Sequence, residues 1–262
     1  SSSNLNTRSI NFGSSTVTLS GTTPIEFGAS TGLTFNAGTS QINCTSITPT
    51  FNGGNQTFYN VSFANTSFGT ATTFTINQAN TFNNLAITDS TVAGVTEVTF
   101  GSRQTINGTL STTGTAGNRR VWFSGATYGI AQTLTVNATP SLTDADFRDI
   151  YVIGTAAPIS GTRIGNLRGC SGITFDAAKT VYWVTAAGGN WSGDNWAASS
   201  GGGASTDNFP LAQDTATIEN TGLNTSATVT MDSAIDYTGT VTMSTRTNAM
   251  TLSFAVSYSI YG

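Results

Sequence analysis

The sequence carries very little charge for its length, and it has no histidine. Of its 262 residues only 8% are Asp, Glu, Lys or Arg, and Lys179 is the only lysine. Without histidine, Ser-His-Asp and Cys-His nucleophile systems and most zinc sites are excluded. Nine basic residues against thirteen acidic ones cannot form the basic face that nucleic-acid binding needs, so nucleic acid is excluded as a partner.

Long apolar runs and cysteines are also scarce. No run of eighteen apolar residues occurs, so we expect no insertion into a membrane. Two cysteines, Cys44 and Cys170, are too few for a disulfide framework. The chain opens with Ser1-Ser2-Ser3-Asn4, without Met or an apolar leader, so we expect a processed product or part of a longer protein.

Small polar residues take the place of charge. There are 102 Ser, Thr and Asn residues and 29 Gly, all of them poor helix formers. Hydrophobic residues reach 37% and aromatic residues 10%, which is too much for a chain that buries nothing. The composition therefore predicts an all-β protein, and it is typical of surfaces exposed outside cells.

Apolar residues recur in pairs separated by one position. This spacing places both members on one face of a strand. Gly, Asn or Ser-Thr clusters follow after about five residues, so each strand is short. The pairs are Ile10/Phe12, Val17/Leu19, Ile25/Phe27, Leu33/Phe35, Ile42/Cys44, Val61/Phe63, Phe74/Ile76, Leu85/Ile87, Val98/Phe100, Val121/Phe123, Leu134/Val136, Val229/Met231, Val241/Met243 and Leu252/Phe254.

The pairs also belong to an internal repeat. The segment 57–63 is echoed twenty-four positions later by 81–87, and Ile10-Asn11-Phe12 precedes Leu33-Thr34-Phe35 by twenty-three. A period of this length with short strands and no helix predicts a parallel β-helix, or β-solenoid, whose stacked turns share one core. The alternative is a β-sandwich with hairpins at Asn52-Gly53 and Asn107-Gly108.

The solenoid makes a prediction about the two cysteines. They lie 126 positions apart, or about five turns, and turns stack at about 4.8 Å. Their sulfurs would then be some 25 Å apart, whereas a disulfide needs Cα atoms within about 7 Å. We expect Cys44 and Cys170 to be free, small core residues.

The pattern changes near residue 180. Val181-Tyr182-Trp183-Val184 is followed by Gly189-Asn190-Trp191, Asn195-Trp196, a Ser200-Gly201-Gly202 loop, Pro210 and the segment 214–218, Asp-Thr-Ala-Thr-Ile. We therefore expect a β-solenoid over 1–180 and a Trp/Gly-rich module with a C-terminal β segment over 181–262.

This order of motifs, with the approach Gly169–Asp176, resembles a module of Ser/Thr/Gly-rich β-helical surface proteins. These include tail-fibre and adhesin-like bacteriophage virion proteins and large bacterial surface proteins. The resemblance covers about fifty residues and assigns no catalytic residue. It implies a location on a virion or at an extracellular cell surface.

Acidic residues cluster at Asp144, Asp146 and Asp149. On a strand the first two would share one face at about 6.6 Å, which suits the carboxylate pair of a glycoside hydrolase or a weak Ca²⁺ site. The alternative is a solvated turn beside Arg148. The basic pair Arg119-Arg120 is expected in a solvated turn or in a contact between subunits.

Aromatic residues cluster at Tyr182, Trp183, Trp191 and Trp196. Exposed, they would form a platform on which sugars stack. Buried, they would fill the core at the junction between the two segments. Asp144, Asp146 and Asp149 are thus weak catalytic candidates, and these aromatics are candidates for glycan binding.

Together these features predict a non-enzymatic structural protein without metal or cofactor, such as a phage fibre, spike or surface appendage. We expect it to assemble with copies of itself and with other virion or surface proteins. The C-terminal segment is expected in that contact through Phe254, Val256, Tyr258, Ile260 and Tyr261. Two alternatives remain. A glycan-binding adhesin for host glycans requires exposed Trp191 and Trp196, and a polysaccharide-degrading spike requires an outward acidic pair in a groove.

Overall fold

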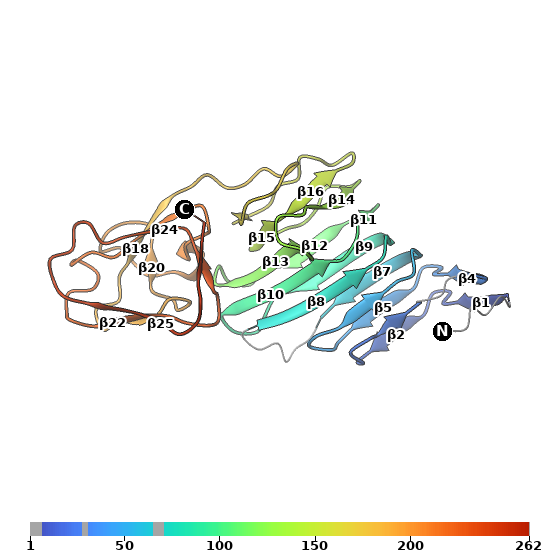
Figure 1. The fold of residues 1–262 in the computed structure, drawn as a ribbon, viewed down its shortest axis with the longest axis horizontal. Helices are drawn as coiled ribbons and strands as arrows, with labels where there is room; N and C mark the ends of the chain where they lie inside the picture. Colours follow the sequence, from blue (N-terminus) through green and yellow to red (C-terminus); the bar gives the residue numbers. More distant parts are fainter. Residues whose placement is uncertain (1–6, 28–30, 65–70, 262) are drawn as a thin grey trace.

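The computed structural model describes residues 7–27, 31–64 and 71–261. The Ser1–Asn4 opening lies outside them. The fold is a β-solenoid of about ten turns, which confirms the predicted class (Figure 1). The described residues contain one short 3-10 helix, Thr206–Asn208, and none of the length and apolarity needed to cross a membrane.

Two long parallel sheets form the first unit of the molecule, which comprises β1 to β17 (Figure 1). A two-stranded sheet of β1 (Arg8–Asn11) and β4 (Leu33–Asn36) accompanies them. The first long sheet consists of β17 (Gly165–Asn166), β15 (Ala145–Arg148), β13 (Arg119–Gly125), β10 (Gly94–Phe100), β8 (Ala71–Asn77), β6 (Thr50–Asn52) and β3 (Ile25–Glu26). The second consists of β16 (Ile150–Ile153), β14 (Gln132–Val136), β11 (Gln104–Ile106), β9 (Thr81–Thr88), β7 (Thr57–Phe63), β5 (Gln41–Cys44) and β2 (Thr16–Leu19), with β12 (Leu110–Thr113) also paired to β9.

The strand register confirms the repeat at its clearest point and corrects it at the start of the chain. Phe58 pairs with Phe82 and Phe63 with Ile87, as the twenty-four-residue echo predicts. Ile10, however, pairs with Phe35 and not with Leu33. A shift of two residues keeps the same side chains on the same face, because strand side chains alternate with a period of two. The pattern of pairs alone therefore did not distinguish the two registers.

Aromatic rings run through the core of the first unit. Phe58 stacks on Phe82 with ring centroids 5.8 Å apart, and Phe123 stacks on Phe147 at 5.1 Å. Both cysteines are free, as expected. Cys44 is fully buried, whereas Cys170 is only partly buried at the edge of the core. Stacked turns thus share one continuous apolar interior.

Side-chain amides form ladders on the outer surface of this unit. Asn84 Nδ2 donates to Asn60 Oδ1 at 2.8 Å, and Asn77 Nδ2 donates to Asn52 Oδ1 at 2.8 Å. Each bond joins residues one repeat apart, because equivalent positions of successive turns lie above one another. The abundance of Asn therefore stabilises the stacking of turns from outside the core.

A second unit, Thr180–Tyr261, does not continue this stack but lies beside β10, β13 and β15 (Figure 1). The only antiparallel pairing among its named strands is β18 with β20. Its core is a separate cluster that also takes in Val95 and Leu167 from the first unit. Its sheets are β20 (Trp196–Ala197), β18 (Thr180–Trp183), β21 (Thr215–Thr217) and β24 (Thr240–Thr242); β19 (Gly189–Asn190), β22 (Thr228–Met231) and β25 (Thr251–Phe254); and β23 (Tyr237–Thr238) with β26 (Ser259–Ile260).

Candidate functional site

The junction between the two units brings together the three most deeply buried charged side chains of the described residues, Arg120, Asp144 and Asp146. In β13 the side chains of Val121 and Phe123 belong to the core of the first unit, so those of Arg120 and Trp122 point to the outer face of the sheet. Asp146 takes the equivalent outward position in β15, opposite Trp122. The second unit covers this face, and it buries side chains that would otherwise be solvated.

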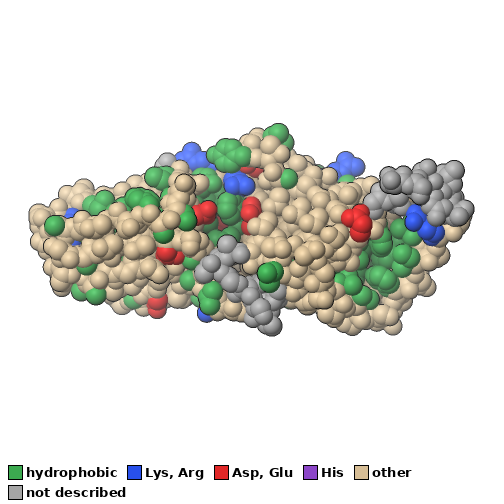
Figure 2. Space-filling view, turned by 60° about the horizontal axis from the view of Figure 1, so that its bottom comes forward, with side chains coloured by type: hydrophobic (Ala, Val, Ile, Leu, Met, Phe, Trp, Pro, Cys, Tyr) green, Lys and Arg blue, Asp and Glu red, His purple; other side chains and the backbone are tan. Residues whose placement is uncertain are grey.

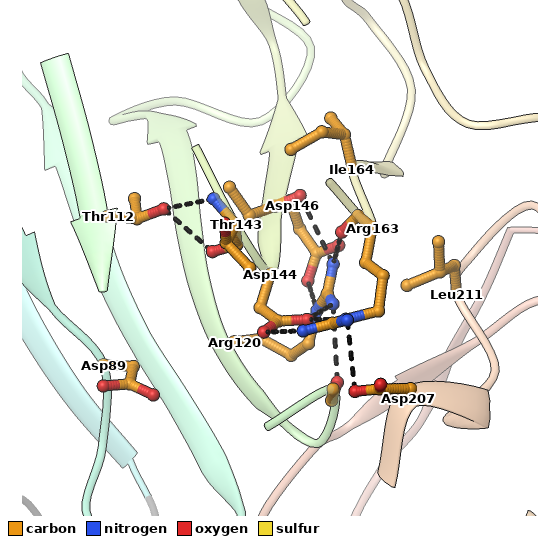
Figure 3. A network of polar contacts seen from close by, with 12 residues as sticks. Asp89, Thr112, Arg120, Thr143, Asp144, Asp146, Arg163, Ile164, Asp207 and Leu211 are labelled. Carbon is orange, nitrogen blue, oxygen red and sulfur yellow. Dashed lines mark hydrogen bonds and ion pairs between the residues drawn. The ribbon is translucent and has the colours of Figure 1, made fainter. Parts of the chain in front are cut away.

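Arg120 is the centre of an ion-pair network at this junction (Figure 3). Its Nε and Nη2 donate to the two carboxylate oxygens of Asp146 at 2.9 and 2.6 Å, and its Nη1 donates to Asp144 Oδ1 at 3.2 Å. All three side chains are fully buried. The guanidinium also donates to backbone carbonyls, including that of Arg163 at 2.7 Å. Bidentate pairing of this kind fixes both partners geometrically.

The network crosses from one unit to the other. Arg163 donates to both oxygens of Asp144, at 2.5 and 2.7 Å, and pairs with Asp207 of the second unit at 3.1 Å (Figure 3). The hydroxyl of Tyr237, also in the second unit, donates to Asp146 Oδ2. These six residues, the junction network, are Arg120, Asp144, Asp146, Arg163, Asp207 and Tyr237. Because the charges are paired and hydrogen-bonded, their burial is tolerated.

Arg120 and Tyr237 keep their protons over the usual pH range. Burial works against the charged form of Arg120, but the paired carboxylates outweigh it and raise the pKa of its guanidinium further. Burial, reinforced by Asp146, raises the pKa of the Tyr237 hydroxyl well above its ordinary value. Neither group is therefore tuned to exchange a proton near neutral pH, as acid–base catalysis requires.

These positions correct what we expected of the charged residues. Asp144 and Asp146 do not lie in a solvated turn or line an open groove, because both are fully buried against Arg120. Asp149 is also buried, and its carboxylate accepts the backbone N–H of Gly129 at 2.8 Å. The outward acidic pair of a polysaccharide-degrading spike is thus missing at this place. In the described part of the chain, no three acidic, Cys or His side chains are grouped to hold a metal.

The tryptophan cluster is the core of the second unit. Trp183, Trp191 and Trp196 have no exposed surface, and Trp196 meets the other two edge-to-face at centroid distances of 5.2 and 4.6 Å. Trp196 Nε1 donates to the carbonyl of Trp191 at 3.0 Å. Tyr182, on the outer face of β18, is half-buried. The sugar platform that we considered is therefore wrong for the three tryptophans, because folding places their rings inside.

The C-terminal candidates for assembly divide into two groups. Phe254, Val256 and Ile260 are 56%, 39% and 70% exposed. Tyr258 and Tyr261 instead contribute to the packing of their own unit: the Tyr258 hydroxyl donates to the carbonyl of Asp232 at 2.6 Å, and Tyr261 is buried against Tyr237.

Sequence reasoning missed the junction, although a signal for it was present. Arg120 lies twenty-four positions before Asp144 and twenty-six before Asp146, close to one repeat. Opposite charges one repeat apart lie on neighbouring turns, so they were candidates for direct pairing. The contribution of the second unit had no such signal. Gln213, for example, accepts the backbone N–H of Asn166 and donates to the carbonyl of Ile164, both at 3.0 Å.

Across the junction, Tyr237 bonds the buried Asp146 and Arg163 pairs with the exposed Asp207. The tryptophans and acids first considered for chemistry are part of the interior. Comparison of the chain with models of protein families, with curated proteins and with solved structures finds no match.

Proposed function

We propose that this chain is a non-enzymatic structural protein of a virion or cell surface, a fibre, spike or similar appendage that assembles with copies of itself. The observation that carries the proposal is the use of its polar groups: amide ladders join successive turns, and the buried charges join the two units. Such a molecule resists deformation along the stack and at the junction.

The pairing of the strands predicts resistance to proteolysis, which suits a role outside cells. Strands of the two long sheets are paired on both sides except at the ends of each sheet. A protease must open the backbone locally before it can cut, and paired strands over a continuous core open rarely. The low content of Lys and Arg also fits a stable surface that carries little charge.

Self-assembly is supported by the outermost strands of the second unit. β24, β25 and β26 each lie at the edge of their sheet. Phe254, Val256 and Ile260 expose apolar surface in or next to them. An edge strand with unpaired backbone groups beside exposed apolar side chains favours pairing with another β-protein.

Sedimentation and mutation test the assembly. We expect the full chain to sediment as an oligomer, and the double substitution Phe254→Ser with Ile260→Ser to shift it to monomer. Ile153→Ser is the matched control, because Ile153 is 52% exposed but lies in the first unit. A monomeric wild-type chain, or assembly unchanged by the double substitution, contradicts the proposed contact.

Two further assays separate the structural role from the alternatives. The chain is expected to survive subtilisin under native conditions and to release no reducing ends from a panel of bacterial polysaccharides. Immunogold labelling with an antibody against the chain is expected to decorate intact particles or cells of its source. Release of reducing ends supports the degrading spike instead, and labelling only after lysis contradicts a surface location.

A further inference from the structure

The first turn of the first unit and the last turn of the second unit both leave strand edges unpaired. Among the described residues, β2 lies at the end of its long sheet and pairs only with β5, and β25 lies at the end of its three-stranded sheet and pairs only with β22. Each of the two strands has four residues without charge or proline. Neither therefore carries the side chains that commonly protect an edge from pairing with another chain.

Apolar side chains at core positions are uncovered at both edges. Phe254 pairs in register with the buried Met231, yet Phe254 is 56% exposed. Leu19 pairs with the fully buried Cys44, yet Leu19 is only partly buried. Because paired residues of parallel strands share a face, both occupy core positions that no further turn covers within the described residues. Figure 2 shows apolar side chains gathered near the end of the molecule that carries β1, β2 and β4 in Figure 1.

The backbone groups of β2 point alternately toward β5 and toward the open edge. The carbonyls of Ser15 and Leu19 accept N–H groups from the β5 side. Successive peptide groups of a strand point to opposite sides, so the N–H and C=O groups of Thr16 and Thr18 point to the open edge. β2 can therefore bond another parallel strand there without losing its pairing with β5.

The backbone groups of β25 alternate in the complementary way. The N–H groups of Thr251 and Ala255 donate to carbonyls on the β22 side. By the same alternation, the N–H and C=O groups of Leu252 and Phe254 point to the open edge. These are the residues whose side chains take core positions, because they pair with the buried residues of β22.

One alignment of β25 with β2 satisfies both the backbone and the core. With Leu252 opposite Val17, the Leu252 N–H would meet the Thr16 carbonyl and the Leu252 carbonyl would meet the Thr18 N–H, in the pattern of a parallel pair. The same alignment keeps the apolar side chains of both strands on the core face. A shift by one residue would move one set to the opposite face.

The sequences and the number of strands also match. β22, which β25 already pairs with, reads Thr-Val-Thr-Met, and β2 reads Thr-Val-Thr-Leu. Each turn has three strands, β1 to β3 and β24 to β26, and all six lie at the end of their sheets. Residues 7–27 and 237–261 contain only three charged side chains, Arg8, Glu26 and Arg246. Repulsion between the two turns is therefore weak.

We propose that the first turn of one copy, β1 to β3, stacks on the last turn of a second copy, β24 to β26, with β2 added to β25 as its next strand. The inference rests on the proposed self-assembly, and it names the surface that receives the C-terminal edge. Because the contact joins two different surfaces, every bound copy keeps one free β2 edge or β25 edge. Assembly then continues into filaments or rings and does not stop at a symmetric dimer.

Sedimentation of proline variants of the full chain tests the contact. Thr18→Pro removes an N–H that points to the open edge of β2, and Phe254→Pro does the same in β25, so the pairing with β5 and β22 is kept. Each variant alone should be monomeric where the wild type assembles, with the contact weakened at least about tenfold. An equimolar mixture should form one-to-one dimers, because Thr18→Pro keeps its β25 edge and Phe254→Pro keeps its β2 edge.

Matched variants control for side-chain loss and misfolding. Thr18→Val and Phe254→Leu keep the backbone N–H and should assemble as the wild type does. Circular dichroism checks that each proline variant is folded. If Thr18→Pro does not fold, Thr16→Pro removes the neighbouring N–H at the same edge and carries the test.

The outcomes separate this inference from the proposed function. Assembly of Thr18→Pro like the wild type, or a mixture that stays monomeric, overturns the inference. If Phe254→Pro is monomeric while Thr18→Pro assembles, self-assembly stands through a contact between two C-terminal edges. A wild-type chain that is monomeric overturns both the inference and the proposed self-assembly.

Cysteine pairs test the register of the contact. The alignment places Thr18 opposite Ser253 of the second copy, on neighbouring strands about 4.8 Å apart, which a disulfide can bridge. A chain with both Thr18→Cys and Ser253→Cys should give a ladder of multimers on a non-reducing gel after oxidation. Either substitution alone is the control and should leave the chain unlinked. A dimer from Ser253→Cys alone, or no ladder from the pair, overturns the proposed register.

Discussion

The two units solve the same packing problem in different ways. In the first unit, strands of up to eight residues repeat in register, and every turn resembles its neighbours. In the second, strands have two to four residues and the core depends on three buried tryptophans. Repetition distributes stability over many similar interfaces, whereas a few large aromatic rings concentrate it.

Because of this difference, the second unit depends on contacts with the first, which include apolar packing around Val95 and Leu167 and hydrogen bonds to buried groups. Its short strands give few backbone pairings, and it gains stability from contact with an already rigid sheet. Tyr237 contacts both Trp122 and Asp146 of the first unit, and Asn118 donates to the carbonyl of Ser192 at 2.7 Å. The predictions below test how far each unit depends on the other.

The largest effect is expected in the core of the first unit. Phe63→Asp buries an unpaired charge between stacked turns, so the chain should fail to fold. Circular dichroism and solubility measure this outcome. Thr16→Asp is the control, because Thr16 is exposed on β2. A soluble, fully folded Phe63→Asp chain would show that the assigned register is wrong.

Loss of Arg120 should uncouple the two units. Arg120→Ala leaves the buried carboxylate of Asp146 without its arginine, while Asp144 keeps Arg163. Breaking a buried pair in this way costs about 3–5 kcal/mol. Three of the four tryptophans lie in the second unit, so tryptophan fluorescence reports its unfolding while circular dichroism reports mainly the first. In Arg120→Ala we expect the fluorescence transition to occur at a lower denaturant concentration than the circular dichroism transition.

Arg119→Ala is the control for that experiment, since among the residues that the structure describes the side chain of Arg119 bonds only the exposed hydroxyl of Thr115. Its fluorescence and circular dichroism transitions should occur at the same denaturant concentrations as those of the wild type. If the fluorescence and circular dichroism transitions of Arg120→Ala occur at the same denaturant concentration, the two units unfold together for a reason other than Arg120.

An intermediate effect is expected from the amide ladder. Asn84 donates to Asn60 and accepts the backbone N–H of Thr109 at 2.6 Å. Asn84→Ala should lower the free energy of unfolding by about 1–2 kcal/mol, because it removes two hydrogen bonds. In the second unit, Asn220 donates to the Thr247 hydroxyl and accepts the backbone N–H groups of Thr247 and Asn248. These three bonds are exposed, whereas that between Asn84 and Asn60 is partly buried. Asn220→Ala should therefore cost less, because water replaces exposed bonds more readily. Equal losses in urea unfolding would contradict the greater role of ladders in the first unit.

The smallest effect concerns the thiols. Burial raises the pKa of Cys170 to about 11 and that of Cys44 to about 12. Because the pKa of each thiol is raised in the folded state, the protonated thiols contribute stability that is fully present below their unfolded-state pKa of 9.0. This stability is lost as the pH rises through about 11 for Cys170 and about 12 for Cys44. At pH 8 the native chain should therefore react slowly with iodoacetamide, Cys44 more slowly than Cys170. Rapid alkylation of Cys44 at pH 8 in the native chain would contradict its burial.

The fold was predictable because the apolar pairs carry its period. Phe58, Val61 and Phe63 find their partners one echo later, since identical spacing in neighbouring turns is what stacking requires. The candidate site was not predictable to the same degree. Asp144 and Asp146 were expected in solvent, and the three tryptophans were left between an exposed platform and a buried core, because local pattern says nothing about a second unit that covers them.

The amino-acid sequence by itself determined the all-β class, the stacking of turns and the exclusion of histidine chemistry, because these follow from composition and from short-range spacing. Tertiary structure decided what the charges and tryptophans do. Arg120 and Tyr237 lie 117 positions apart, yet both bond Asp146. Contacts between units depend on how two folded surfaces fit. That fit joins residues far apart in the chain, so no periodicity in the chain encodes it.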